Sequence, residues 1–71
     1  MEGLMLDKLS NKRLIYSFVS AVNLGLEDLF IRYLYEEIIK RELQTEAINQ
    51  LNTYGLDGEK IISELKQVSI S

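Results

Sequence analysis

Apolar residues in the first third of the chain recur with the period of an α-helix. Leu14, Phe18 and Val22 follow one another at steps of four residues, which places their side chains on one helical face. Ser10 stands before this stretch, where its hydroxyl can accept a hydrogen bond from a free amide of the first turn. Gly25 follows the stretch and can adopt the left-handed conformation that closes a helix. The pattern predicts a helix that begins after Ser10 and ends before Gly25.

A second helical stretch follows the turn predicted at residues 23–26. Glu27 and Asp28 supply negative charge where the positive end of the next helix dipole is expected. Apolar residues then continue at helical spacing: Phe30, Ile31, Leu34, Ile38 and Leu43. No Gly or Pro interrupts the chain from there to Gly55. We therefore expect the second helix to run on beyond residue 44, with a kink; the alternative is a restart with Thr45 as a cap.

The last part of the chain contains one more turn and one more helix. Residues 52–58 combine two glycines with Asn and Asp, which is typical of a turn. Apolar residues at helical spacing follow this turn: Ile61, Ile62, Leu65 and Val68. The predicted fold is all-α, an antiparallel helical hairpin with a short additional C-terminal helix. Residues 1–71 are interpreted as a single small domain with a hairpin core at 8–43 and a C-terminal extension at 44–71.

Composition and charge narrow the function classes. The 71 residues are 46% hydrophobic and 27% charged, which is typical of a folded domain. A chain of this size buries only about 60% of its unfolded surface, so we expect a homo-oligomer or a bound partner. The net charge is −3, with eight basic residues interleaved among eleven acidic ones. No basic field attracts phosphates, and nucleic-acid binding is disfavoured.

Residue types that support catalysis and metal binding are largely missing. The chain has no His and no Cys, so we expect neither an enzyme, nor a metal site, nor a cofactor. Carboxylate pairs such as Glu36 with Glu37, or Glu42 with Glu46, are ordinary on exposed helices. The lack of Cys fits a reducing compartment, and we expect a cytoplasmic protein. Apolar runs are far shorter than the roughly 20 residues that cross a bilayer, so no membrane association is expected.

The predicted hairpin tip is more apolar than a two-helix core can bury. Its four large apolar residues are Leu24, Leu26, Leu29 and Phe30. Exposed apolar clusters commonly mark interaction sites, and we interpret these four residues as a candidate protein-binding site. The alternative is that they pack on the additional C-terminal helix or inside a homo-oligomer.

Residues at a fixed joint spacing carry a resemblance to a known family. They are Lys8-Leu9-Ser10, Leu14-Ile15, Ser17, Ala21, Leu26, Phe30-Ile31, Glu37-Ile38, Arg41 and Leu43. Through them the stretch from Lys8 to Leu43 resembles the sporulation-inhibitor Sda family of spore-forming Gram-positive bacteria. The resemblance implies a helical hairpin that binds the helical dimerisation and phosphotransfer domain of a sensor histidine kinase. It also implies that phosphate is kept from entering a relay.

The same resemblance implies which residues bind the kinase. In the family this surface includes a Leu in the turn and a Phe at the start of the second helix, and Leu26 and Phe30 occupy those positions here. Family members usually end soon after the second helix. Residues 44–71 are therefore an addition that could cap the hairpin, build a dimer or contact a different target.

A second resemblance leaves an alternative open. Three short segments are similar, after a one-residue shift, to the NblA adaptors that promote phycobilisome degradation in cyanobacteria: Leu34-Tyr35-Glu36-Glu37, Lys40-Arg41-Glu42 and Gly55-Leu56-Asp57. This resemblance implies a proteolysis adaptor. A further alternative is a self-assembling helical interaction protein with another client, including one of phage or mobile-element origin.

Overall fold

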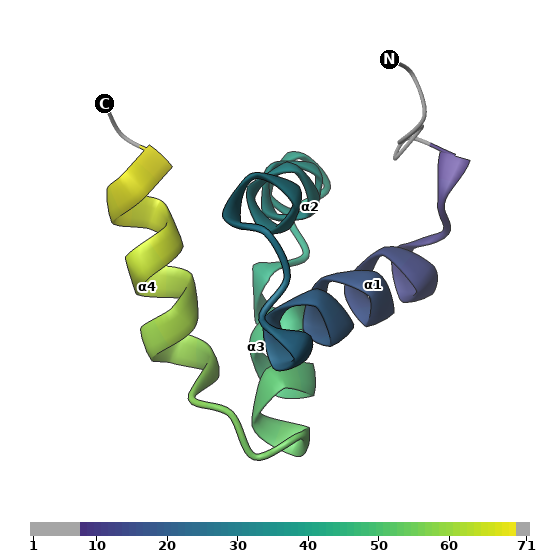
Figure 1. Cartoon of the computed structure of the whole chain (residues 1–71). Coiled ribbons are helices and arrows are strands. Elements are labelled where there is room, and N and C mark those ends of the chain that lie inside the picture. Colours follow the sequence, from purple (N-terminus) through teal and green to yellow (C-terminus); the bar gives the residue numbers. More distant parts are fainter. Residues whose placement is uncertain (1–7, 70–71) are drawn as a thin grey trace.

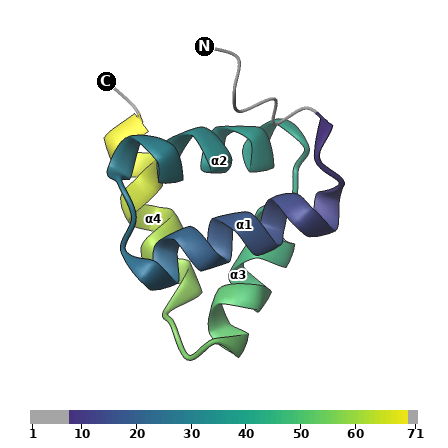
Figure 2. The same cartoon turned by 45° about the vertical axis from the view of Figure 1, so that its right-hand side comes forward.

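The structure, a computed structural model, describes residues 8–69 and is built of helices. The helices are α1 (Asn11–Leu24), α2 (Asp28–Lys40), α3 (Gln44–Thr53) and α4 (Gly58–Ser69). Residues 8–69 contain no strand, so the predicted all-α class is confirmed. Figures 1 and 2 show α1 between α2 and α3, with α4 along one flank.

The first hairpin is built from the signals that the sequence carries. The Ser10 hydroxyl accepts a hydrogen bond from the Arg13 amide at 3.2 Å. Gly25 adopts the left-handed conformation with φ of 68°, and the Leu26 amide reaches back to the Ala21 carbonyl at 3.0 Å. These bonds satisfy groups that a helix end otherwise leaves free. The chain then reverses, and α2 returns antiparallel beside α1 (Figure 2).

The second helix is not continuous, and the expectation that it runs beyond residue 44 is wrong. α2 ends at Lys40 and α3 begins at Gln44. The chain does restart a helix here, but the N-cap residue is Leu43 and not Thr45 as in the alternative. Glu42 lies between them in the left-handed conformation with φ of 57°. The amide of Leu43 donates to the Ile38 carbonyl at 2.9 Å, so α2 closes as a helix usually closes at a glycine.

Burial of apolar side chains explains this break. The chain turns at residues 41–43, so that Ala47 and Leu51 of α3 become fully buried while α3 packs on α1. A straight continuation of α2 would carry both residues away from α1. The buried apolar residues form one cluster: Leu14, Ile15, Phe18, Val19, Ala21, Leu34, Tyr35, Ile38, Leu43, Ala47, Leu51 and Ile62. Tertiary packing has therefore overridden the helical continuity of the sequence.

The turn between α3 and α4 holds the two helices close together. Gly55 is left-handed with φ of 83°, and the Leu56 amide bonds back into α3. The Asn52 side chain accepts a hydrogen bond from the Gly58 amide at 3.0 Å. A Cβ at Gly58 would lie 2.6 Å from the carbonyl oxygen of Ile48, so only glycine fits this approach. α4 is thus positioned at its N-terminus by the end of α3 (Figure 1).

Candidate functional site

Three leucines around the α1–α2 turn are exposed. The exposed fractions are 69% for Leu24, 44% for Leu26 and 59% for Leu29. Leu24 is the last residue of α1, Leu26 follows the left-handed glycine, and Leu29 lies in the first turn of α2. α4 leaves these three side chains exposed, contrary to the alternative in which the C-terminal helix buries them. We call Leu24, Leu26, Leu29 and Phe30 the hairpin tip.

Phe30 differs from the other three residues of the hairpin tip. It is half-buried and packs against the core cluster. Leu34, which is buried, lies four residues further along α2 on the same helical face. Phe30 therefore joins the exposed leucines to the interior, and its replacement affects stability as well as any surface function.

The exposed apolar surface of α2 continues beyond the four predicted residues. Tyr33 is 49% exposed and follows Leu29 by four residues, so both side chains lie on one face of α2. Tyr33 is not among the four residues that the sequence pattern predicts for the site. The i, i+4 spacing between Leu29 and Tyr33 indicates that Tyr33 belongs to the same exposed face. This indication becomes usable once Leu34 and Ile38 are known to be buried in the core.

Acidic side chains border the hairpin tip. Glu27 and Asp28 are both exposed, and Asp28 lies in the first turn of α2, where a negative charge favours the helix dipole. The next cation along α2 is Arg32, which is half-buried. A partner surface that combines apolar contacts with basic residues would match this arrangement.

Glu37, near the end of α2, forms ion pairs with two basic side chains. Its carboxylate lies 3.0 Å from the Arg41 guanidinium and 4.0 Å from the Lys40 ammonium. These pairs lie at the opposite end of α2 from the hairpin tip. They support the helix and its contact with the start of α1, and they do not contribute to the candidate site.

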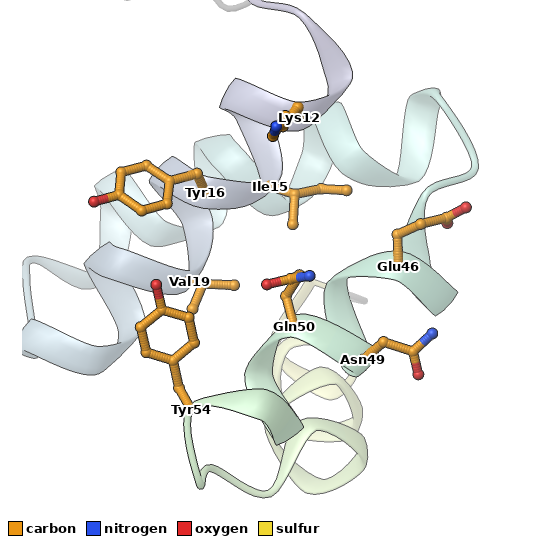
Figure 3. A pocket seen from close by; sticks show the side chains of 8 residues that line it. All are labelled: Lys12, Ile15, Tyr16, Val19, Glu46, Asn49, Gln50 and Tyr54. Atoms are coloured by element: carbon orange, nitrogen blue, oxygen red, sulfur yellow. The ribbon is translucent and has the colours of Figure 1, made fainter.

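A second apolar surface lies in a groove between α1 and α3. It has a volume of about 290 Å³. Ile15 and Val19 line its apolar part, and the exposed rings of Tyr16 and Tyr54 lie at one side, on the left of Figure 3. The sequence has no local signal for this groove, because Tyr54 lies in a segment that is typical of a turn. It forms when the break after α2 brings α3 against α1.

Few side-chain groups among the described residues are arranged for metal binding or catalysis. No group of three or more carboxylates within residues 8–69 is placed to hold a metal ion. Burial raises the pKa of the Tyr35 hydroxyl, which has no hydrogen-bond partner among the described residues. Its ring packs against Phe18 with centroids 6.3 Å apart. We interpret Tyr35 as a core residue.

None of α1 to α4, over the residues described, is both long and apolar enough to cross a membrane.

Comparison with known proteins identifies a family. The family model described as sporulation inhibitor A (Sda) matches residues 5–50, which is more than half of the 71-residue chain. The match includes α1, α2, the hairpin tip and most of α3, and it ends before α4. No curated protein and no solved structure matches the chain. The resemblance that the sequence suggests is thereby confirmed, and the chain belongs to the sporulation inhibitor A (Sda) family.

Proposed function

We propose that this protein inhibits a sporulation sensor histidine kinase by binding the helical domain that dimerises the kinase and transfers its phosphate. The observation that carries the proposal is the exposure of Leu24, Leu26 and Leu29 at the hairpin tip, in a chain whose family is named for inhibition of sporulation. Inhibition by contact requires no catalytic group from the inhibitor. The proposal also implies that the protein acts in the cytoplasm, where it would bind the kinase domain.

The physical basis is burial of apolar surface at a few anchors. A fully buried leucine contributes about 1.5–3 kcal/mol relative to an exposed one, and a few central anchors carry most of the energy of an interface. Leu26 and Leu29 are free to make such contacts because the fold leaves them exposed. Phe30, the residue after Leu29, packs against the core cluster. The helical kinase domain would be bound in the helix-in-groove manner.

The test uses leucines whose replacement leaves the core intact. We expect Leu26→Ala and Leu29→Ala each to weaken binding by about 1–4 kcal/mol, measured by titration calorimetry with the purified kinase domain. Loss of inhibition in a phosphotransfer assay should follow the loss of binding. Ile39→Ala is the matched control, because it removes an exposed apolar side chain of α2 that lies outside the hairpin tip and outside the groove between α1 and α3.

Circular dichroism must show that the leucine variants remain helical. Unchanged binding by the Leu26→Ala, Leu29→Ala double variant would rule out the hairpin tip as the binding site. Failure of the wild-type protein to bind the kinase domain would rule out the proposed function.

Self-association is a second candidate, favoured by the groove between α1 and α3. Tyr16 and Tyr54 are exposed beside it, and a second chain that covered both rings would remove apolar surface from water. Sedimentation of the wild-type protein over a range of concentrations tests this. A dimer that Tyr16→Ala dissociates would support the groove as its interface, and a monomer at all concentrations would exclude it.

An NblA-like adaptor function has less support. The family model that matches the chain is that of Sda and covers residues 5–50. The similarity to NblA adaptors involves three short segments between residues 34 and 57 and needs a one-residue shift.

A further inference from the structure

A cleft separates α4 from the end of the first hairpin. Its volume is about 300 Å³. Val22 of α1 and Ile31 of α2 line one side, and Ile61 and Leu65 of α4 line the other. All four side chains are half-buried, so each presents apolar surface to the cleft that the residues described by the structure do not cover completely. α2 and α4 both contribute lining residues, and Figure 1 shows the course of these two helices.

The cleft adjoins the hairpin tip. Asp28 belongs to its lining, and the next residue is Leu29 of the hairpin tip. Asp28 and Leu29 both lie in the first turn of α2, so a partner that covers Leu29 lies within one helical turn of the cleft lining. The geometry extends the candidate binding surface from the hairpin tip toward α4, which lies outside the residues matched by the family model.

The position of α4 is set by specific contacts at its N-terminal end. Gly58 approaches the Ile48 carbonyl so closely that a Cβ would lie only 2.6 Å from the oxygen, and the Asn52 side chain holds the Gly58 amide. Ile62, one turn later, is buried in the core. Beyond this anchor, Ile61 and Leu65, four residues apart, form one apolar row along α4 that faces the cleft. The cleft is thus a consequence of how α3 and α4 are joined.

The rim of the cleft is charged. Asp28 and Glu64 are exposed and line the cleft from α2 and α4. Neither carboxylate is within ion-pair distance of a cation among the described residues. The third charged residue, Arg32, has its Nε buried without a hydrogen-bond acceptor in residues 8–69. Two unpaired carboxylates beside an apolar floor complement a partner whose apolar contacts are flanked by Lys or Arg.

We propose that this cleft receives one amphipathic helix of the client, with an apolar stripe flanked by basic residues. The inference rests on the proposed function, because the occupant is a helix of the kinase domain that the hairpin tip binds. An inserted helix would pack against α2 and α4 on its two sides, as a ridge enters a groove between helices. α4 then adds a second wall to the family's binding surface and contributes to the choice of partner.

Charge reversal on α4 tests the inference. Glu64→Lys places a cation on the rim of the cleft and should weaken binding of the purified kinase domain about tenfold at low ionic strength, with a smaller loss at high salt. Glu59→Lys is the matched control. It makes the same change in net charge on the same helix, and Glu59 is exposed and lies outside the cleft lining. At about 0.15 M ionic strength its affinity should stay within about twofold of the wild type, because the Debye length is then about 8 Å and exposed charges away from a contact are screened.

A second measurement reports on the cleft directly. The methyl resonances of Ile61 and Leu65 should shift when the kinase domain is added to the full-length protein, and thermal melts must show that both charge variants fold. Equal affinities of Glu64→Lys and Glu59→Lys, together with unchanged methyl resonances, would overturn the inference. The proposed function would remain in place if Leu26→Ala still weakens binding. Absence of wild-type binding would overturn both.

Discussion

Arg41 donates a hydrogen bond from Nη1 to the backbone carbonyl of Leu9 across 2.8 Å, although 32 positions separate the two residues. The same nitrogen donates to the Asn11 side chain at 3.0 Å, and Nε donates to Glu37 at 3.0 Å. The guanidinium therefore ties the end of α2 to the start of α1. This contact closes the open end of the hairpin, opposite the turn that carries the leucines.

Replacement of Arg41 should destabilise the fold. Hydrogen bonds of a charged group contribute about 1.5–3 kcal/mol, and the Arg41 side chain is largely shielded from solvent. We expect Arg41→Ala to lower the free energy of unfolding by about 1–3 kcal/mol in urea titrations. Lys40→Ala is the control. The Lys40 side chain is exposed, and its ammonium lies 4.0 Å from the Glu37 carboxylate, which makes a long and weak ion pair. Its removal should therefore cost less than about 0.5 kcal/mol. Equal losses would contradict a structural role for the Leu9 contact.

Gly58→Ala should loosen α4 in particular. The added Cβ would meet the Ile48 carbonyl oxygen at 2.6 Å, and backbone must move to admit it. We expect a loss of about 1–3 kcal/mol and faster amide hydrogen exchange in α4 than in α1. Gly25→Ala is the comparison, since no atom lies within 4 Å of its added Cβ. There the left-handed backbone alone should cost about 1–2 kcal/mol, with no selective effect on α4.

Glu42→Gly should stabilise the protein. Glu42 is a non-glycine residue with a φ of 57°, a conformation that costs an L-residue about 1–2 kcal/mol. Glycine removes this strain. It also gives the unfolded chain more conformational entropy, which lowers stability by about 0.5–1 kcal/mol. We therefore expect a net gain of about 0.5–1 kcal/mol in thermal and urea unfolding. Glu36→Gly, in the interior of α2, should instead lower stability by about 1 kcal/mol. A loss at both positions would contradict the helix break.

Tyr35→Phe should leave the fold at least as stable as the wild type. The Tyr35 hydroxyl is buried without a partner among residues 8–69, so its removal should raise stability by up to about 1 kcal/mol. Burial raises the pKa of this hydroxyl above its ordinary value of 10.0. The folded state holds the proton more tightly than the unfolded state, so wild-type stability should fall as the pH rises above 10 toward the folded-state pKa.

The phenylalanine variant lacks that ionisation and should lose less stability above pH 10. Urea titrations of both proteins at neutral pH and above pH 10 measure the difference. A marked loss of stability in Tyr35→Phe at neutral pH would show that the hydroxyl has a bonding partner.

The sequence by itself determined the local structure of the first hairpin and its apolar tip. Ser10, Gly25 and Leu26 act through hydrogen bonds to residues a few positions away, and such short-range bonds depend on residue type and spacing. The apolar residues beside the turn are also predictable from residue type and spacing. The four large apolar residues of the hairpin tip exceed what two helices can cover, and the structure leaves its three leucines exposed.

Tertiary structure alone decided the break at Glu42 and the place of α4. No glycine marks the left-handed position at residue 42, because the break is stabilised by the burial of Ala47 and Leu51 against α1, far away in the sequence. The cleft beside the hairpin tip likewise depends on the close approach of Gly58 to Ile48. Packing between distant segments has no local sequence signal, since its free energy comes from contacts that exist only after the helices have assembled.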